Sequence, residues 1–246
     1  MQTVLITGCS SGFGLETARY FLDQGWRVVA TMRNPDPAIL PASDQLKVIA
    51  LDVTDRESIR RCLAEAGPID VLVNNAGIGM FNALEGTPID VARDIFETNT
   101  LGTMTMTQAV LPQFRERKAG VIVNVTSTVT LRPLPLLSVY TASKAAVNAF
   151  TESVALELAP FGIRARLVLP GRAPTTRFGE NARARIGEFP APYAAFAAKV
   201  FEGLRDATTP TTSSSAVAEA VWRAATDPSC PMRIPAGDDA EIWFNA

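Results

Sequence analysis

The chain has 246 residues, of which 47% are hydrophobic and 20% are charged, so it is long enough for one large core and too short for two full domains with separate functions. Its net charge of −2 disfavours binding to nucleic acid or to anionic membranes, so we expect a small-molecule partner. Histidine is absent, which excludes a Ser-His-Asp or Cys-His triad and removes the commonest zinc ligand. Any proton transfer must therefore come from other side chains, and we expect no metal site.

The cysteines and the N-terminus bear on where the protein resides. Cys9, Cys62 and Cys230 are odd in number and far apart, so neither a disulfide framework nor a paired metal-ligand motif is visible. The chain passes from Met1 into an apolar run without the basic flank of a secretory signal. No apolar run approaches the ~18 residues of a membrane span. We expect a soluble, cytoplasmic protein in reducing surroundings.

The first half of the chain alternates apolar runs with segments of helical spacing. Thr3–Thr7 is typical of a buried parallel strand, and the helical stripe of Leu15, Ala18 and Leu22 follows it and ends at Gly25. Further strands are predicted at Arg27–Met32, Lys47–Leu51 and Asp70–Asn74, and a helix at Asp55–Ala66. Alternating strands and helices predict right-handed βαβ units. The fold class is therefore α/β, with a Rossmann-like doubly wound parallel sheet of about seven strands.

The second half continues this alternation and then departs from it. A long helical section is predicted from Pro88 to about Lys118, with a break near Asn99. Later strands are predicted at Val121–Val125, Ile163–Leu169 and Met232–Ile234, and helices at Ser138–Pro160, Ala191–Leu204 and Ala216–Thr226. Residues 172–215 are rich in Pro, Thr, Ala and Arg, and an excursion of this length favours a substrate lid over a plain loop. No domain boundary is visible, so residues 1–246 are predicted to form a single dinucleotide-binding and catalytic domain with a lid insertion.

A glycine-rich turn, Gly8-Cys-Ser-Ser-Gly-Phe-Gly14, follows the first predicted strand. Glycines at such a place allow a tight turn, a close approach of the backbone to a pyrophosphate, and close packing of the next helix. The spacing differs from the common dinucleotide fingerprint, and a purely structural turn is the alternative, but the position between strand and helix favours nucleotide binding. The candidate contacts are Gly8, Ser10, Ser11, Gly12, Phe13 and Gly14.

The end of the second predicted strand, Thr31-Met-Arg-Asn34, carries no acidic residue. Sites that prefer NAD place a carboxylate here for the ribose hydroxyls, whereas a cation accommodates a 2′-phosphate. Arg33, helped by the hydroxyls of Ser10 and Ser11 and flanked by Asn34, can bind that phosphate through charge-assisted hydrogen bonds. A solvated surface arginine is the alternative. We expect NADP(H) rather than NAD(H).

Tyr140 and Lys144 are four residues apart in a predicted helix, so they lie one turn from each other on one face. A phenol has an ordinary pKa of about 10 and transfers protons poorly at neutral pH. A fixed ammonium nearby favours the phenolate and lowers that pKa. A tyrosine packed at a helix end beside a solvated lysine is the alternative.

Several short motifs follow one another along the chain. They are Thr7-Gly-Cys-Ser-Ser-Gly-Phe-Gly14, Asn74-Asn-Ala-Gly77, Asn99, Ser127, Tyr140-x-x-x-Lys144, Pro170-Gly171 and Thr175. In this order the sequence resembles the short-chain dehydrogenases/reductases of the compact type, over nearly the whole chain from Thr3 to Ile234. Several independent motifs in one order are far more specific than any one of them.

The resemblance implies a role for each matched residue. Ser127 would hydrogen-bond the substrate oxygen, Tyr140 would be the acid or base, and Lys144 would hold the nicotinamide ribose while lowering the pKa of the tyrosine. Asn99 would hold a water that links Lys144 to solvent. The remaining cofactor contacts would be Asp52 and Val53 at the adenine, Asn75, Ala76 and Gly77 on the adenosine-ribose side, and Pro170, Gly171 and Thr175 at the nicotinamide. In reduction, a hydride would pass to a carbonyl carbon and Tyr140 would protonate the oxygen.

The chain departs from the family pattern at three places. Thr130 stands where many relatives have glycine, and the apolar loop Thr128–Leu137 should border the substrate. The segment Pro231–Gly237 replaces a common Val-Asp-Gly-Gly ending, which puts the usual tetramer in question, so we expect a homodimer or a homotetramer. These features resemble the hydroxysteroid and retinol dehydrogenase-like carbonyl reductase branch. The lid aromatics are Phe178, Phe189, Tyr193, Phe196 and Phe201; core or oligomer contacts would explain most of them, but some should face the site.

Three functions remain open at this point. The leading one is an NADPH-dependent carbonyl reductase, reversible as an alcohol dehydrogenase, that acts on bulky apolar or aryl ketones. A 3-oxoacyl thioester reductase is the alternative among enzymes. A non-catalytic NADP-sensing protein is the alternative of another class, and the presence of Asn99, Ser127, Tyr140 and Lys144 argues against it because a sensor would not need all four.

Overall fold

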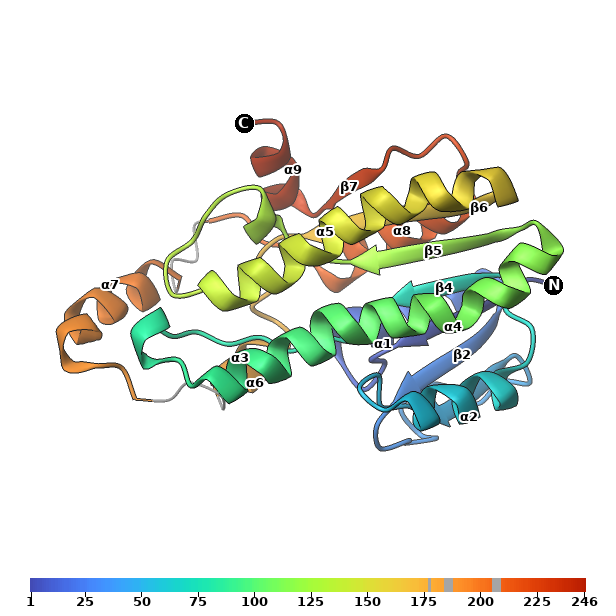
Figure 1. The fold of residues 1–246 in the computed structure, drawn as a ribbon, viewed down its shortest axis with the longest axis horizontal. Coiled ribbons are helices and arrows are strands. Elements are labelled where there is room, and N and C mark those ends of the chain that lie inside the picture. Colours follow the sequence, from blue (N-terminus) through green and yellow to red (C-terminus); the bar gives the residue numbers. More distant parts are fainter. Residues whose placement is uncertain (177, 184–187, 205–208) are drawn as a thin grey trace.

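A parallel sheet lies between two layers of helices in the computed structural model, which describes residues 1–176, 178–183, 188–204 and 209–246 (Figure 1). The sheet has seven strands in the order β3-β2-β1-β4-β5-β6-β7, and all neighbours are parallel. The strands are β1 (Thr3–Thr7), β2 (Arg27–Met32), β3 (Leu46–Ala50), β4 (Val71–Asn74), β5 (Gly120–Val125), β6 (Ile163–Pro170) and β7 (Arg233–Ala236). The predicted Rossmann-like sheet is confirmed, and β1 and β2 have the predicted bounds.

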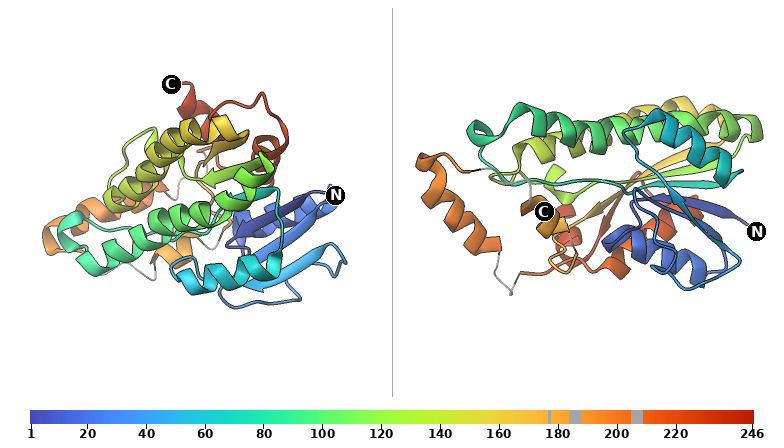
Figure 2. Two further views of the ribbon diagram at one scale, coloured as in Figure 1. Left: turned by 45° about the vertical axis from the view of Figure 1, so that its right-hand side comes forward. Right: turned by 90° about the horizontal axis from the view of Figure 1, so that it is seen from below.

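Helices cover both faces of the sheet (Figure 2). On one face lie α1 (Gly12–Asp23) and α8 (Ser214–Thr226), and on the other α2 (Arg56–Ala66), α4 (Gly102–Arg117) and α5 (Ser138–Leu158). Side chains alternate along each strand, so Val4 and Ile6 join the core under α1 and α8, whereas Leu5 joins the core under α2, α4 and α5. Burial on both faces explains why the strands are near-continuous apolar runs.

The helix ends follow local signals in the sequence. Asp55 accepts a hydrogen bond from the backbone N–H of Glu57 and so caps α2. Ser213 caps α8 in the same way through the N–H of Ala216. The predicted stop of α1 at Gly25 is also confirmed, because this glycine follows the helix with a φ of +76°.

The long helical section is continuous instead of broken at Asn99. It consists of α3 (Ile89–Phe96), a π-helical turn (Glu97–Leu101) and α4. A π-turn inserts one wider turn without ending the helix, and such turns are frequent at functional sites. The prediction of a break was therefore wrong, but an irregular turn does lie at Asn99, where the break was expected.

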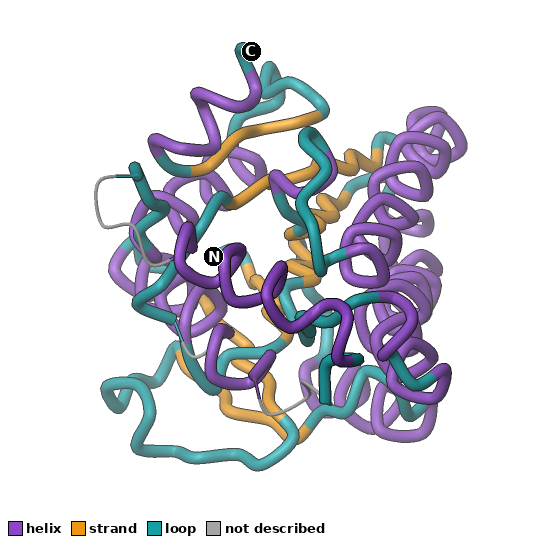
Figure 3. The backbone as a smooth tube through the Cα atoms, turned by 90° about the vertical axis from the view of Figure 1, so that its left-hand side faces the viewer, coloured by secondary structure: helices purple, strands orange, loops and turns teal. Residues whose placement is uncertain are grey.

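The described parts of the segment predicted as a lid lie beyond the carboxyl ends of the strands, on the side that faces the viewer in Figure 3. They contain α6 (Phe178–Arg183), a 3-10 turn (Ala191–Tyr193) and α7 (Ala194–Leu204). The sequence pattern did not predict α6 or the C-terminal α9 (Asp238–Phe244), since both are too short for helical periodicity to be recognised. No helix within the described ranges is long and apolar enough to cross a membrane.

Short 3-10 turns complete the structure. They are Leu84–Gly86, Thr128–Thr130 and Ala159–Phe161. The first lies against the lid segment, because a Cβ on Gly86 would lie only 2.6 Å from the ring of Pro190. The second follows Ser127 directly and so shapes the surroundings of a predicted catalytic residue.

Candidate active site

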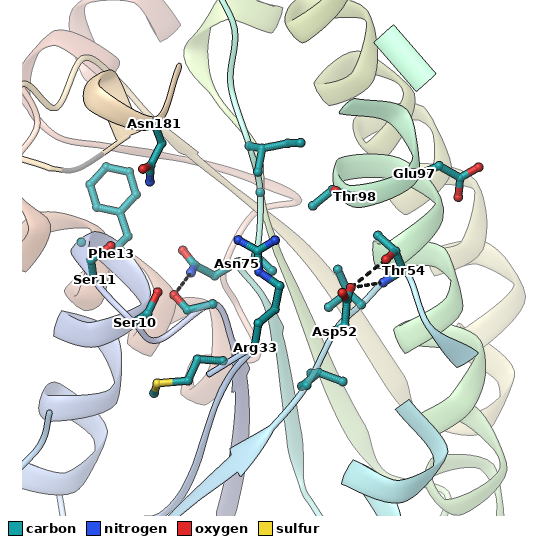
Figure 4. A pocket seen from close by; sticks show the side chains of 18 of the residues that line it. Ser10, Ser11, Phe13, Arg33, Asp52, Thr54, Asn75, Glu97, Thr98 and Asn181 are labelled. Atoms are coloured by element: carbon teal, nitrogen blue, oxygen red, sulfur yellow. Dashed lines mark hydrogen bonds between the residues drawn. The ribbon is translucent and has the colours of Figure 1, made fainter. Parts of the chain in front are cut away.

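A cleft of about 680 Å³ opens beside the carboxyl ends of β1, β2 and β4 (Figure 4). The predicted cofactor residues that line it are Gly8, Ser10, Ser11, Gly12, Phe13, Arg33, Asp52, Val53, Asn75, Ala76 and Gly77. Residues that the sequence reasoning missed also line it, namely Met32, Leu51, Thr54, Ile78, Asp94, Glu97, Thr98, Thr176 and Asn181. The structure thus brings most of the predicted cofactor contacts together at the strand ends, where ligands bind in open α/β sheets.

The glycine turn is shaped by close backbone contacts. Gly8 has a φ of +76°, and a Cβ on it would lie 2.8 Å from the Cα of Ala76. A Cβ on Gly14 would collide with the carbonyl oxygen of Gly8. Gly14 does not line the cleft itself, but it lets α1 begin against the turn. The backbone at the N-terminus of α1 therefore forms part of the cleft wall, where an anion is favoured.

Asn75 and Thr7 brace the floor of the cleft. The side-chain amide of Asn75 donates to the carbonyl oxygens of Thr7 at 2.9 Å and of Gly8 at 3.2 Å. The hydroxyl of Thr7 accepts from the backbone N–H groups of Asn75 at 3.0 Å and of Ala76 at 2.9 Å. These bonds join the ends of β1 and β4 at the floor of the cleft.

Asn74 is buried in a chain of polar side chains below the cleft. Its amide donates to Asn124 at 2.9 Å, and the amide of Asn124 donates to the hydroxyl of Thr151 at 2.7 Å. Buried polar groups that are paired in this way hold neighbouring elements in one register. Asn74 thereby ties β4 through β5 to α5, the helix that carries Tyr140.

Arg33 extends from the end of β2 into the cleft, between Ser10 and Asp52 (Figure 4). Its side chain is exposed, whereas the carboxylate of Asp52 is held by the backbone N–H and the hydroxyl of Thr54 at 2.9 and 2.7 Å. Burial opposes ionisation of Asp52, but the hydrogen bonds from Thr54 and the charge of Arg33 together hold its pKa below the usual value. Asn34, also predicted as a contact, is exposed and does not line the cleft.

Four buried polar residues form the predicted catalytic group. Tyr140 is 6% exposed, Lys144 5%, Ser127 8% and Asn99 1%. Tyr140 and Lys144 lie one turn apart near the start of α5, and Ser127 follows β5. Burial raises the pKa of Tyr140 above its usual range, while the hydrogen bond with Ser127 lowers it. That hydrogen bond brings two hydroxyl groups to one place, where both can face a substrate oxygen.

Lys144 connects this group with the cleft. Its ammonium donates to the carbonyl oxygen of Val125 at 3.0 Å. A Cβ on Gly77 would lie 3.3 Å from its Nζ and 3.2 Å from Oδ1 of Asn99, so both side chains adjoin the cleft wall. Burial lowers the pKa of Lys144 to about 8. The lowering of the Tyr140 pKa expected from Lys144 is opposed here by the burial of the phenol.

Asn99 lies in the π-turn, and its side chain forms hydrogen bonds with two other segments of the chain. Its amide accepts from the N–H of Ile78 at 2.8 Å and donates to the carbonyl oxygen of Ile78 at 2.9 Å and to the hydroxyl of Ser143 at 3.1 Å. The side chain thereby fixes the cleft-lining segment after β4 against α5. Its predicted role in holding a water stays a prediction.

The predicted contacts at the nicotinamide end are arranged differently from expectation. Pro170 ends β6, and neither it nor Gly171 lines the cleft. Thr175 is exposed, whereas Thr176 lines the cleft and its Cβ would lie 3.4 Å from a Cβ on Gly12. The turn after β6 therefore presents the second of two adjacent threonines, a choice that the motif spacing could not reveal.

Thr130 and Asn148 hold Ser127 in place, and sequence reasoning missed this role. The hydroxyl of Thr130 donates to the carbonyl oxygen of Ser127 at 2.8 Å and accepts from the amide of Asn148 at 2.9 Å. Asn148 follows Lys144 by one helical turn, so its position on the same face of α5 was the available signal. Thr130 thus links the turn after Ser127 to α5, the helix that carries Tyr140 and Lys144.

Apolar side chains surround Tyr140. Val129, Leu137 and Tyr140 form a buried cluster against which Phe81 and Leu134 pack. The ring of Phe81 lies 5.9 Å from that of Phe201 on α7, and the rings of Phe189 and Phe201 are 6.0 Å apart. Phe196 is half-exposed, and the side chain of Phe178 lies outside the described residues. Some of the lid aromatics therefore do face the predicted substrate region.

Leu136 belongs to a second cluster with Ala83 and Ala197, next to Phe189 and Phe201. The apolar loop after Ser127 thus contacts both Tyr140 and the segment predicted as a lid. As for metals, the described residues hold no group of three or more His, Cys, Asp or Glu side chains that could bind an ion.

Comparison with known proteins gives a consistent result. The family model described as short chain dehydrogenase matches residues 2–186. Retinol dehydrogenase 8 of Bos taurus is 42% identical over 182 residues, which are 69% of this chain and 58% of that protein. Estradiol 17-beta-dehydrogenase 1 of Rattus norvegicus is 40% identical over 187 residues, or 70% of this chain and 54% of that protein. The chain therefore spans little more than half the length of these relatives.

Solved structures match over nearly the whole chain. A short-chain dehydrogenase from Streptomyces avermitilis has a TM-score of 0.85 and 35% identity and covers 99% of this chain and 90% of its own. The closed form of a serine dehydrogenase complexed with NADP⁺ has a TM-score of 0.83 and 29% identity, with 96% and 95% covered.

Proposed function

Because the chain belongs to the short-chain dehydrogenase/reductase family, an NAD(P)-dependent group that acts on carbonyls or alcohols, we propose that it is an NADPH-dependent carbonyl reductase. The reaction would reversibly convert a ketone or aldehyde to an alcohol, with a bulky apolar or aryl ketone as the substrate. The observation that carries this proposal is the hydrogen-bonded pair of Ser127 and Tyr140, next to Lys144 at the wall of a dinucleotide-sized cleft.

The cleft fits a dinucleotide. Gly8, Gly12 and Gly77 line the cleft with backbone only, and the N-terminus of α1 would favour a pyrophosphate. Arg33, Ser10 and Ser11 would bind a 2′-phosphate, and Asp52 would adjoin the adenine. When bound, NADPH supplies the hydride that reduces the carbonyl carbon. The NADP⁺ complex of the serine dehydrogenase supports the choice of cofactor by analogy only.

Tyr140 and Ser127 would polarise and protonate the substrate oxygen. Because burial raises its pKa, Tyr140 is protonated at neutral pH and is ready to act as the acid. Donors aimed at an oxygen that gains negative charge stabilise the transition state more than the ground state. The buried Lys144 ammonium, one turn away, would stabilise the phenolate that remains.

The walls around Tyr140 indicate the substrate class. Phe81, Val129, Leu134 and Leu137 are apolar and adjoin the phenol, and Phe201 extends this surface onto the lid. Apolar and aromatic walls bind apolar surface and offer no partner for a charged substrate. The names of the retinol and estradiol dehydrogenases to which the chain is similar fit this choice. Residues 172–215 would act as the lid.

A cofactor and substrate panel tests the proposal. We expect reduction of an aryl ketone with NADPH at a kcat/KM at least about tenfold higher than with NADH, and little reduction of a short 3-oxoacyl thioester. Preference for the thioester would instead identify the alternative reductase. Binding of NADPH without turnover of any carbonyl or alcohol would identify a non-catalytic sensor.

A further inference from the structure

A buried polar cluster, here called the hinge cluster, consists of Gly171, Arg172, Thr212 and Asp239. It lies where the neighbouring parallel strands β6 and β7 end, at Pro170 and Ala236. The hydroxyl of Thr212 accepts from the N–H of Gly171 at 3.0 Å and lies 2.9 Å from the carbonyl oxygen of Ala236 and 2.7 Å from Oδ1 of Asp239. Thr212 is 1% exposed and Asp239 6%. The hydroxyl thus joins both strand ends to the segment that returns from the lid.

Asp239 uses both carboxylate oxygens in this cluster. Oδ2 accepts from the backbone N–H of Arg172 at 2.6 Å, and Oδ1 adjoins the hydroxyl of Thr212. A carboxylate placed in the first turn of a helix is stabilised there, and Asp239 occupies that turn of α9. One side chain of the C-terminal helix therefore holds both the segment that leaves β6 and the segment that returns.

Two glycines make room for this arrangement. A Cβ on Gly171 would collide with the Asp239 carboxylate. Gly237 has a φ of +104°, and a Cβ there would lie 2.7 Å from Cβ of Thr212. The close approach of Thr212 and Asp239 to the strand ends depends on both glycines, so the cluster is a built feature of the fold and not a chance surface contact.

Arg172 extends the cluster to α7. Its guanidinium donates to the carbonyl oxygen of Leu204, at the end of α7, at 2.7 Å and to that of Thr209 at 3.1 Å. Its own carbonyl oxygen accepts from the N–H of Thr212 at 2.8 Å. A cation at the carboxyl end of a helix is favourable. Because α7 carries Phe201, which packs on Phe81 beside Tyr140, the hinge cluster is linked to the cover of the predicted substrate region.

We propose that Asp239 is a positioning residue that, through Thr212 and Arg172, holds the carboxyl end of α7 and thereby the place of Phe201 beside the apolar cluster around Tyr140. The C-terminal helix would then set the affinity for the carbonyl substrate and leave the proton transfer at Tyr140 unchanged. The inference rests on the proposed function only in assigning a substrate to the space under α7. The role of the hinge cluster in holding α7 can be tested without any activity.

The first test measures hydrogen–deuterium exchange around the hinge cluster without substrate. Thr212→Val and Asp239→Asn should speed hydrogen–deuterium exchange in α7 and α9 about tenfold, because buried partners lose their hydrogen bonds, while α1 keeps its exchange rates. Thr212→Ser retains the hydroxyl and should keep exchange slow. Thr107→Val is the matched control, since Thr107 is equally buried and accepts from Asn74 far from the lid. The proposal would be overturned if exchange in α7 stayed unchanged in Thr212→Val, or if Thr107→Val changed it equally. It would also be overturned if exchange in Thr212→Ser were as fast as in Thr212→Val.

The second test uses the enzyme. Thr212→Val should raise the KM for the ketone about tenfold, while kcat and the Kd of NADPH change by less than about twofold. A fall in kcat with an unchanged KM would contradict a role in substrate affinity. If the unaltered protein reduces no carbonyl, the proposed function fails. The exchange measurement still decides whether the hinge cluster holds α7 in place.

Discussion

Lys144 and Tyr140 are both buried, and burial shifts their pKa values in opposite directions. The phenol stays protonated because its charged form is disfavoured, while the ammonium becomes easier to deprotonate. The spacing of the two residues only suggested the pair, and the prediction rested on the surrounding motifs, among them Asn99 and Ser127. The sequence could not predict these shifts, because the burial that causes them depends on packing between distant segments; Tyr140, for example, packs with Val129, Leu137 and Phe81.

The pH dependence of reduction follows from these states. Reduction requires a protonated Tyr140 and a charged Lys144, and Lys144, with a pKa of about 8, titrates first as the pH rises. The kcat/KM for ketone reduction should therefore fall about tenfold per pH unit above that pKa. Lys144→Arg, which keeps its charge, should move this decline to higher pH if it folds. A flat profile between about pH 7 and 10 for the unaltered enzyme would contradict the assignment.

Arg33 is expected to decide the choice between NADPH and NADH. Arg33→Ala should raise the KM for NADPH about 10- to 100-fold, because a charge-assisted hydrogen bond to the 2′-phosphate is lost, and leave the KM for NADH nearly unchanged. Arg27→Ala is a suitable control, since Arg27 is an exposed arginine at the other end of β2. Equal effects on both cofactors would show that Arg33 is only a surface cation.

Elements were predicted well where periodicity is strong. The strands and the helices α2 and α5 were predicted from apolar runs that are buried in the structure, and Asp55 caps the start of α2. The π-helical form of the turn at Asn99 and the hydrogen bonds of the Asn99 side chain with Ile78 and Ser143 needed the structure. That the apolar loop after Ser127 borders the substrate stays a prediction, and the contacts of Thr130 needed the structure.

The turn after β5 should affect catalysis through orientation. Thr130→Val removes the hydroxyl that bonds to the Ser127 carbonyl oxygen and to Asn148, so Ser127 should lose its fixed orientation. We expect kcat for ketone reduction to fall about three- to tenfold with an unchanged Kd for NADPH. Thr130→Ser, which retains the hydroxyl, should stay within about twofold of the original rate. An unchanged kcat in the valine variant would show that Ser127 is held by other contacts.

At the scale of the whole molecule, the cleft and the predicted catalytic residues lie at the carboxyl ends of the strands of one sheet. The hinge cluster was not predictable, because Arg172 and Asp239 are 67 residues apart and carry no motif. The choice of Thr176 over Thr175 likewise depends on the path of the chain after β6. Assembly into a homodimer or homotetramer stays a prediction.

The central claim is that Tyr140 supplies the proton for carbonyl reduction, and Tyr140→Phe tests it most directly. The variant keeps the ring that packs on Val129 and Leu137, so NADPH should bind with an unchanged Kd. Tyr20→Phe is the control, because Tyr20 loses the same hydroxyl on α1, where it packs against Trp222. Ketone reduction by Tyr140→Phe should fall about 10²- to 10⁴-fold in kcat. Reduction at the original rate would contradict the claim.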